Sequence, residues 1–303
     1  MDQAEQLRNL IKTGQNGECG ADNHNARPLS RVITVTSGKG GVGKSNTSIN
    51  LAIHLKKLGK RVIILDADFG LANIEIMFGT VPKHNLCDLI YQGKNIKDII
   101  TWGPGEIGFI SGGSGIAGLS NLSRDYLTYI IQNLAELDAI ADVIIIDTGA
   151  GISDAVLEFL VASGEILLVT TPEPTSITDS YSLIKALNRH PRFSKENSKI
   201  KVIANRVNNA DDGRNLFKKL NSVVSRYLGL EIEYLGQIPY DQQLADAVMQ
   251  QSPVSLAHPG AKSAKAYEEI AARLMNMEVE GKIKKRGMAA FFSHIIANKK
   301  AHE

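Results

Sequence analysis

The sequence predicts an α/β fold, a doubly wound and mainly parallel sheet with helices on both faces. Three observations lead to this prediction. Short, apolar, β-rich runs recur along the chain with helical patterns between them. A glycine-rich loop joins the first run to the first helical pattern. Acidic residues directly follow two of the runs, which is the end of the strands where sheets of this kind bind their ligands.

The candidate strands share a high content of Val, Ile and Leu and are separated by polar or glycine-containing segments. They are residues 31–36, 61–66, 107–111, 143–147, 166–170, 201–204 and, more weakly patterned, 233–236. The first long helix is predicted over residues 46–58, because apolar residues recur there at helical spacing and Gly59 follows as a stop signal.

The loop between the first strand and this helix, residues 37–45, reads SGKGGVGKS and matches the pattern G-x-x-x-x-G-K-[ST]. A strand, a glycine loop and a helix in this order turn backbone N–H groups and a helix N-terminus towards phosphate. We expect Lys44 to reach the β- and γ-phosphates of a nucleotide and the Ser45 hydroxyl to hold Mg²⁺. The nucleotide-binding residues expected here are Gly38, Lys39, Gly40, Gly41, Val42, Gly43, Lys44, Ser45 and Asn46.

Carboxylates end the second and fourth runs. Asp66 and Asp68 follow the second, and Asp147 follows four apolar residues in the fourth, as in a Walker B element whose carboxylate supports Mg²⁺. Two acidic groups after one strand suit two tasks, the orientation of metal-bound water and of the attacking water. Because phosphoryl transfer needs mainly positioning and charge stabilisation, these groups predict a nucleotide-hydrolysing site.

Composition narrows the class of protein. The chain has 303 residues, 43% of them hydrophobic, and a formal net charge of +2, which does not favour direct nucleic-acid binding. Its two cysteines lie far apart and outside any C-x-x-C pattern, so neither a disulfide framework nor a cysteine metal site is expected. The polar, acidic start and the lack of a long apolar run predict a cytoplasmic protein.

Four parts are expected along the chain: an amphipathic helix over residues 1–12, a flexible linker over 13–28, a globular body over 29–277, and a basic amphipathic helix over 281–303. The last part suits an anionic membrane interface, where one helix binds weakly and two on a dimer bind through avidity. An alternative is that this helix packs on its own body. The two can coexist if the helix is docked in the monomer and released in the dimer. Its apolar face comprises Met288, Phe291, Phe292, Ile295 and Ile296.

The glycine loop, the Asp66-Ala67-Asp68 segment and the segment 147–151, Asp-Thr-Gly-Ala-Gly, resemble the deviant Walker A ATPases, which include MinD, the ParA partition proteins and the nitrogenase iron protein. The resemblance covers about residues 29–277. It implies an ATP-dependent homodimer in which Lys39 reaches the phosphates bound by the other subunit. It makes Lys39, Lys44 and Asp68 the catalytic residues, with Asp68 orienting the attacking water, and it assigns the Mg²⁺ shell to Ser45, Asp66 and Asp147.

Softer matches to the same group complete the expected site. The segment after the fifth run resembles the part of MinD that faces the dimer partner, so a dimer interface is expected at Lys39, Glu173, Thr175 and Asp179. Positions after the last two runs resemble those that hold adenine in this group, which are here Asn205, Arg206, Pro239 and Tyr240.

The N-terminal residues 2–8 resemble the DQAxxLR element of the flagellar-number regulators, the FlhG, FleN or YlxH family. The resemblance implies stimulation of an FlhF-type signal-recognition GTPase, control of flagellar number and placement, and reversible attachment to the inner face of the cell membrane. Flagellar switch-complex proteins and a flagellar transcription regulator are further expected partners. Two alternatives stay open, a MinD-type division-site ATPase and an ATP-binding scaffold with little turnover. The element comprises Asp2, Gln3, Ala4, Leu7 and Arg8.

Overall fold

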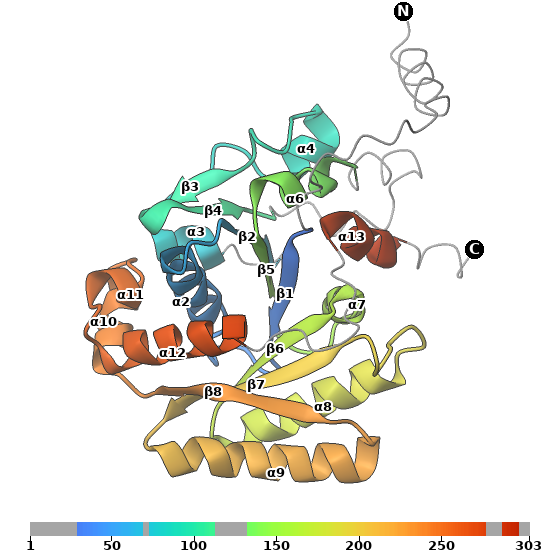
Figure 1. Ribbon diagram of the computed structural model, residues 1–303, viewed down its shortest axis with the longest axis vertical. Coiled ribbons are helices and arrows are strands. Elements are labelled where there is room, and N and C mark those ends of the chain that lie inside the picture. Colours follow the sequence, from blue (N-terminus) through green and yellow to red (C-terminus); the bar gives the residue numbers. More distant parts are fainter. Residues whose placement is uncertain (1–28, 69–72, 113–131, 277–286, 297–303) are drawn as a thin grey trace, which may run out of the picture.

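The computed structural model describes residues 29–68, 73–112, 132–276 and 287–296 (Figure 1). The predicted N-terminal helix and its linker, and with them the five DQAxxLR positions, lie outside the described residues. Among those residues, no helix has both the length and the apolar character needed to cross a membrane.

One eight-stranded sheet forms the centre of the described chain, in the order β3-β4-β2-β5-β1-β6-β7-β8. Its neighbouring strands are parallel except for β3, which pairs with β4 in the antiparallel sense. The doubly wound, mainly parallel fold is therefore confirmed, although the short edge strand β3 was not among the predicted strands. The strands are β1 Arg31–Thr36, β2 Val62–Ala67, β3 Thr101–Gly103, β4 Ile107–Ile110, β5 Val143–Thr148, β6 Glu165–Thr170, β7 Lys199–Val207 and β8 Ile232–Pro239.

Helices cover both faces of the sheet (Figure 1). Apolar residues of α2 and α10 to α12 pack on one face, and those of α4, α6 to α9 and α13 pack on the other. The helices of the described residues are α2 Lys44–Lys57, α3 Asn73–Phe78, α4 Leu86–Gln92, α6 Leu137–Ile140, α7 Asp154–Ala162, α8 Pro174–Arg189, α9 Ala210–Leu228, α10 Gln242–Met249, α11 Val254–Ala257, α12 Lys262–Asn276 and α13 Met288–Ile296, and the 3₁₀ turn η1 covers Pro104–Glu106.

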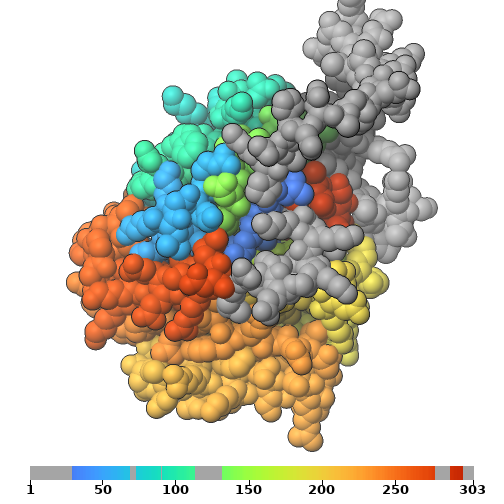
Figure 2. All heavy atoms as spheres, viewed as in Figure 1, coloured from blue at the N-terminus to red at the C-terminus, as the bar shows by residue number. Residues whose placement is uncertain are grey.

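Segments from the two ends of the body lie together. Figure 2 shows the orange C-terminal helices beside the blue N-terminal segments on one face of the molecule. The contact between α2 and α12 joins them below the surface, where Ile49 and Tyr267 belong to one apolar cluster. The glycine loop and its helix are thus held between the sheet and the C-terminal part of the body.

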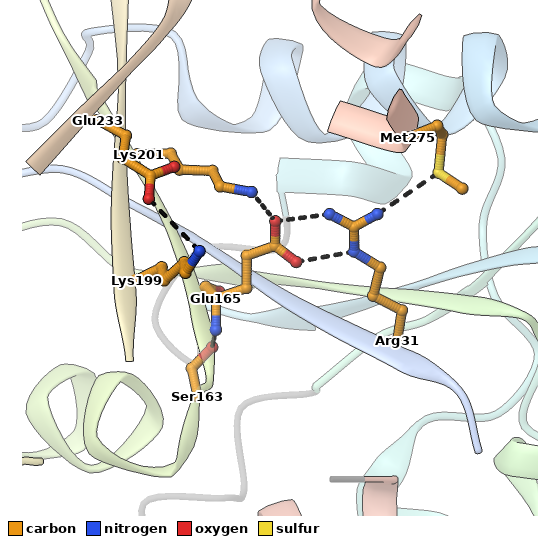
Figure 3. Close-up of polar contacts among 7 residues, drawn as sticks. All are labelled: Arg31, Ser163, Glu165, Lys199, Lys201, Glu233 and Met275. Atoms are coloured by element: carbon orange, nitrogen blue, oxygen red, sulfur yellow. Dashed lines mark hydrogen bonds and ion pairs between the residues drawn. The ribbon is translucent and has the colours of Figure 1, made fainter. Parts of the chain in front are cut away.

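A buried ionic cluster lies at the amino end of the strands (Figure 3). Glu165 of β6 accepts two hydrogen bonds from the Arg31 guanidinium, at 2.7 and 2.8 Å, and one from the Lys201 ammonium at 2.6 Å. Burial raises the pKa of the Glu165 carboxyl, but Arg31 and Lys201 outweigh that effect and hold it below its usual value. Arg31 also donates to the Met275 sulfur at 3.7 Å, so the cluster connects β1, β6 and β7 with α12.

Helix α13 lies on the body, as in the docked alternative, and its attachment to a membrane stays a prediction. Met288, Phe291 and Phe292 are buried in the cluster formed with α4, α6 and α7. The Phe291 and Phe292 rings lie 6.0 and 6.4 Å from the ring of Phe159 on α7. The alternative of a helix docked on its own body is therefore the one that the structure contains. Ile295 packs against the same cluster.

Both ends of α13 are also bound by polar groups. The Asp138 carboxylate on α6 accepts from the backbone N–H of Met288 at 3.1 Å, which caps the positive end of the helix. Gly287 allows this approach, because a side chain at that position would collide with the same carboxylate. At the other end Arg192 donates to the His294 carbonyl and pairs with Glu158 of α7. Buried apolar contacts and polar contacts at both of its ends therefore hold α13 on the body.

Candidate active site

The glycine loop leaves a helix N-terminus open. Helix α2 begins at Lys44, two residues earlier than predicted, directly after Gly43. Gly41 and Gly43 have φ angles of +74° and +99°, a region of backbone conformation that strongly favours glycine. No side chain caps the first N–H groups of α2. Those groups are therefore free to bind an anion, which supports the predicted phosphate cradle.

Neighbouring elements fix the loop in place. The Asn205 amide at the end of β7 donates to the Val42 carbonyl at 2.7 Å. The backbone N–H of Gly151 donates to the Ser37 carbonyl at 3.0 Å, which ties the loop to the segment after β5. A side chain at Gly38 would collide with the backbone of Asp179 on α8. The structure thus brings two predicted site residues, Asn205 and Asp179, against the loop.

Lys39 has partners within its own chain. Its ammonium lies 3.0 Å from a carboxylate oxygen of Glu173 and 3.0 Å from the Thr175 hydroxyl, at the start of α8. Its side chain is 39% exposed and that of Glu173 is 56% exposed, so the pair lies at the surface of the site. The hydrogen bond from Lys39 lowers the pKa of Glu173. Three residues predicted for a dimer interface therefore meet one another in the single chain.

Two carboxylates lie side by side beneath the loop. Asp66 of β2 and Asp147 of β5 are register partners, and both are buried. Burial, together with the charge of Asp147, raises the pKa of Asp66 to about 7. Burial raises the pKa of Asp147 to about 6, although the Ser45 and Ser48 hydroxyls and the Lys44 charge counteract it. Without a bound cation, keeping both buried carboxyl groups ionised costs free energy. This is typical of a site that binds a cation.

Asp68 stands apart from this pair. Its side chain is partly exposed, and the Asn73 amide at the start of α3 donates to its Oδ2 at 3.2 Å. Its backbone N–H donates to Asp66 Oδ1 at 3.0 Å, which fixes the turn after β2. A Cβ placed on Gly149 would lie 3.5 Å from Asp68 Oδ1, so the carboxylate faces the segment after β5. This partly exposed position beside Asp66 and the segment after β5 is compatible with the predicted role of orienting water.

The residues present fit Mg²⁺. The Oδ2 atom of Asp147 is buried and finds no hydrogen-bond partner in the described parts of the chain. Carboxylate and hydroxyl oxygens, which Asp147, Asp66 and Ser45 offer, are the ligands that Mg²⁺ prefers. Within the described ranges no group of three or more His, Cys, Asp or Glu side chains forms a metal cage. A bound Mg²⁺ would therefore complete its shell with phosphate oxygens and water, as is usual for this ion.

The expected adenine residues lie together at the carboxyl ends of β7 and β8. Asn205 is paired in register with Ile238, and the Tyr240 N–H donates to the Val207 carbonyl at 2.9 Å. Arg206 has a φ angle of +56° at an irregularity of the β7–β8 pairing, and the Tyr240 side chain is 62% exposed. Pro239 ends β8 between these groups. Asn205 is buried and contacts the glycine loop through Val42, whereas Arg206 and Tyr240 are exposed.

Sequence reasoning missed two polar residues of this site. The Ser48 hydroxyl donates to Asp147 Oδ1 at 2.8 Å, one helical turn after Lys44, and Asn73 holds Asp68. The position of Ser48 on the same helix face as Lys44 is a signal that could have found it. No local signal marks Asn73, because its role depends on how α3 starts after the turn.

Comparison with known proteins places these features in a family. Residues 33–254 match the CobQ/CobB/MinD/ParA nucleotide binding domain. The antiactivator FleN of Pseudomonas aeruginosa is 42% identical over 80% of this chain and 86% of that protein. The flagellum site-determining protein YlxH of Helicobacter pylori is 34% identical over 97% of this chain and 98% of that protein.

Solved structures agree on the fold. A MinC:MinD cell division protein complex from Aquifex aeolicus has a TM-score of 0.64 at 24% identity, covering 84% of this chain and 99% of that chain. The septum site-determining protein MinD of Pyrococcus horikoshii, complexed with Mg-ADP, has a TM-score of 0.64 at 22% identity, covering 84% and 100%. These two likenesses show the fold alone.

Proposed function

Because this chain belongs to the CobQ/CobB/MinD/ParA nucleotide-binding family as a MinD/ParA-type ATPase, we propose that it is an ATP-dependent dimerising switch that controls flagellar number and placement. The flagellar part of the proposal is supported by relatives named for flagellar roles at 42% and 34% identity. The septum site-determining protein MinD of Escherichia coli is 28% identical, which favours the flagellar role over division-site placement.

The observation that carries the dimer proposal is the surface position of Lys39. The loop that binds phosphate holds Lys44 in a buried place, whereas Lys39 lies on the rim with Glu173 and Thr175. A solvent-exposed ion pair of this kind contributes little stability, so Lys39 can leave it at low cost. We infer that Lys39 exchanges Glu173 for the phosphates bound by a second subunit, as a cation supplied in trans does in related reactions.

The chemistry at the site then divides among residues of this chain. The α2 N-terminus and Lys44 bind the phosphates, while Asp68, held by Asn73, accepts a hydrogen bond from the attacking water and orients it. A Mg²⁺ bound by Ser45, Asp66 and Asp147 would neutralise charge on the phosphates. Lys39 of the partner would complete the charge stabilisation, which makes turnover depend on dimer formation.

The segment after β5 offers a route from this site to α13. Residues 148–153 connect Asp147 with the start of α7, and α7 carries Phe159 against Phe291 and Phe292. We propose that a shift of this segment on ATP binding loosens the α7–α13 contact and frees the apolar face of α13. Two freed helices on one dimer would bind an anionic membrane through avidity.

We infer that the N-terminal DQAxxLR element stimulates GTP hydrolysis by an FlhF-type GTPase. The proposal rests on the sequence match at positions 2–8. Adding the full chain to such a GTPase should raise the rate of GTP hydrolysis, and Gln3→Ala should reduce that effect without changing ATP turnover by this protein. Equal stimulation by the two proteins would contradict a role for Gln3.

Size-exclusion chromatography combined with a phosphate-release assay tests the proposed switch. With ATP and Mg²⁺ the protein should elute as a dimer, and its phosphate release per subunit should rise with protein concentration. With ADP it should elute as a monomer. A dimer that releases no phosphate would favour the scaffold alternative, and a rate per subunit that stays constant across concentrations while dimers form would contradict dimer-activated hydrolysis.

A further inference from the structure

A hollow of about 120 Å³ lies at the free edge of the sheet, and none of the candidate site residues described above lines it. Strand β8 is the last strand of the sheet, and α9 and α12 lie on its two sides (Figure 1). The hollow opens between these helices, with Tyr234, Gly236 and Gln237 of β8 at its base. Its volume is below the roughly 300–1,000 Å³ of pockets for whole small molecules, so it suits a single functional group.

Glycines give the hollow its shape. A side chain at Gly213 of α9 would collide with the Gln237 amide oxygen and the Tyr234 hydroxyl. A Cβ at Gly236 would lie 2.8 Å from the Ile270 side chain of α12. Both helices therefore approach β8 closely, and the polar groups on its edge are held between them.

The groups that face the hollow are mainly hydrogen-bond donors. The Tyr234 hydroxyl donates to Gln237 Oε1 at 2.8 Å, which occupies the acceptor of that amide. In the described parts of the chain the Gln237 amide nitrogen has no acceptor. The base of the hollow thus presents an N–H donor that is open to water or to a ligand.

Two guanidinium groups add positive charge. Arg214 of α9 and Arg273 of α12 both line the hollow, and both charges act on the Tyr234 hydroxyl, whose pKa burial raises and they lower. Arg214 has no carboxylate within 4.0 Å among the described residues. Arg273 lies 3.8 Å from Glu269 and donates weakly, at 3.4 Å, to the Leu235 carbonyl. The ion pair is 55% and 71% exposed, so Arg273 is only weakly satisfied.

We propose that this hollow is a carboxylate-binding site, filled by an acidic side chain of a partner protein. Two planar guanidinium forks and one amide donor match the two oxygens of a carboxylate, which accepts hydrogen bonds at several positions. With two Arg and one Glu the lining carries a net charge of +1, so an anionic side chain complements it. The open sheet edge gives a partner chain access to this group without entering the nucleotide site.

The test uses the full chain labelled for NMR and two blocked tripeptides that differ only at the centre, glutamate in one and glutamine in the other. The glutamate peptide should shift the backbone signal of Gly236 and the side-chain amide signal of Gln237 in a saturable way. Arg214→Gln and Arg273→Gln should each weaken this binding about tenfold or more, as expected for the loss of a charge-assisted hydrogen bond. The matched control Lys218→Gln, one turn further along α9 and outside the hollow, should bind like the original protein.

Three results would overturn the proposal. Equal shifts with the glutamine peptide would show that charge is not recognised, and unchanged binding by Arg214→Gln would remove the guanidinium from the site. Saturation by inorganic phosphate together with no response to the glutamate peptide would assign the hollow to a phosphoryl group. Thermal unfolding of each variant, compared with the Lys218→Gln control, shows whether a loss of binding comes from a loss of fold.

Discussion

Lys39 connects the nucleotide site with the surface. The sequence singles it out, because Lys44 already supplies the lysine of the G-x-x-x-x-G-K-[ST] pattern and a second lysine inside the loop needs its own explanation. What the pattern does not contain is its contact with Glu173 and Thr175, which lie more than a hundred residues away and reach it only through the β1–β6 pairing. The sequence indicated that Lys39 is a candidate site residue, but it did not indicate that Lys39 contacts Glu173 and Thr175 within its own chain.

The change Lys39→Ala tests the role of this residue. We expect the variant to retain ATP binding, because Lys44 and the α2 N-terminus remain, and to lose concentration-dependent phosphate release. Since a cation supplied in trans accounts for about 10³–10⁵ in rate in related reactions, the loss should be large. Fluorescent-nucleotide binding and phosphate release measure the two effects separately. Unchanged turnover would contradict the proposed role.

His54, which is not one of the candidate nucleotide-site residues, makes the free energy of unfolding depend on pH. Burial, helped by the charge of Lys57, lowers its pKa from 6.5 to about 4, and its Nε2 lies 2.9 Å from the Ser255 hydroxyl. As pH falls from 6.5 to about 4, the unfolded chain takes up a proton that the folded chain does not, so the free energy of unfolding decreases.

The variant His54→Gln should remove this contribution and keep a polar group near Ser255. Urea unfolding above pH 6.5 and again near the folded pKa measures the free energy of unfolding of both proteins. The decrease on acidification should be smaller in the variant than in the original protein. The same decrease in both proteins would contradict a buried, neutral His54.

At the scale of elements, the buried cluster around Glu165 holds three strands at their amino ends (Figure 3). The change Glu165→Gln would leave Arg31 and Lys201 as buried cations without their anion, which costs about 3–5 kcal/mol of stability in comparable sites. The matched control is Glu233→Gln, whose partner Lys199 lies 3.8 Å away in a more exposed pair. The control should cost less than about 1 kcal/mol. Equal losses in denaturant unfolding would contradict the assignment.

Helix α13 shows why an amphipathic pattern cannot choose between two apolar surroundings. The sequence indicates the face that carries Met288, Phe291 and Phe292, but burial in a membrane and burial against α7 select the same residues. The decisive partners, Phe159 and the Asp138 cap, come from distant parts of the chain. The structure describes a helix over Met288–Ile296 within the predicted range 281–303, and its contact with the body was one of the alternatives that the pattern left open.

Removing residues 281–303 tests the release of this helix. The truncated protein should lose ATP-dependent co-sedimentation with anionic vesicles, and its melting temperature should fall because the cluster around Phe159 becomes exposed. The full chain should sediment with vesicles in ATP and stay in solution in ADP. If the truncated protein still sediments with ATP, or the full chain binds equally well in both nucleotides, the release mechanism is wrong.

At the scale of the whole molecule, local patterns predicted the fold and the residues that the structure brings together at the candidate site. The glycine loop, Asp66, Asp68 and Asp147 are each defined by a few neighbouring residues, and parallel strands bring their carboxyl ends together. The Glu165 cluster, the hollow beside β8 and the docked α13 depend on pairs that are distant in sequence. The edge strand β3 was missed because three residues, Thr101–Gly103, carry too little pattern to predict a strand.

Mixing two inactive variants shows whether Lys39 acts on the nucleotide of the other subunit. In a mixed dimer of Lys39→Ala and Asp68→Ala, the first subunit holds ATP with its own Asp68 and receives Lys39 from the second. Random mixing should therefore restore about a quarter of the original phosphate release, since half of the dimers are mixed and each has one complete site. Each variant alone should stay inactive. If the mixture also stays inactive while sizing shows that mixed dimers form, Lys39 does not act in trans and the account is contradicted.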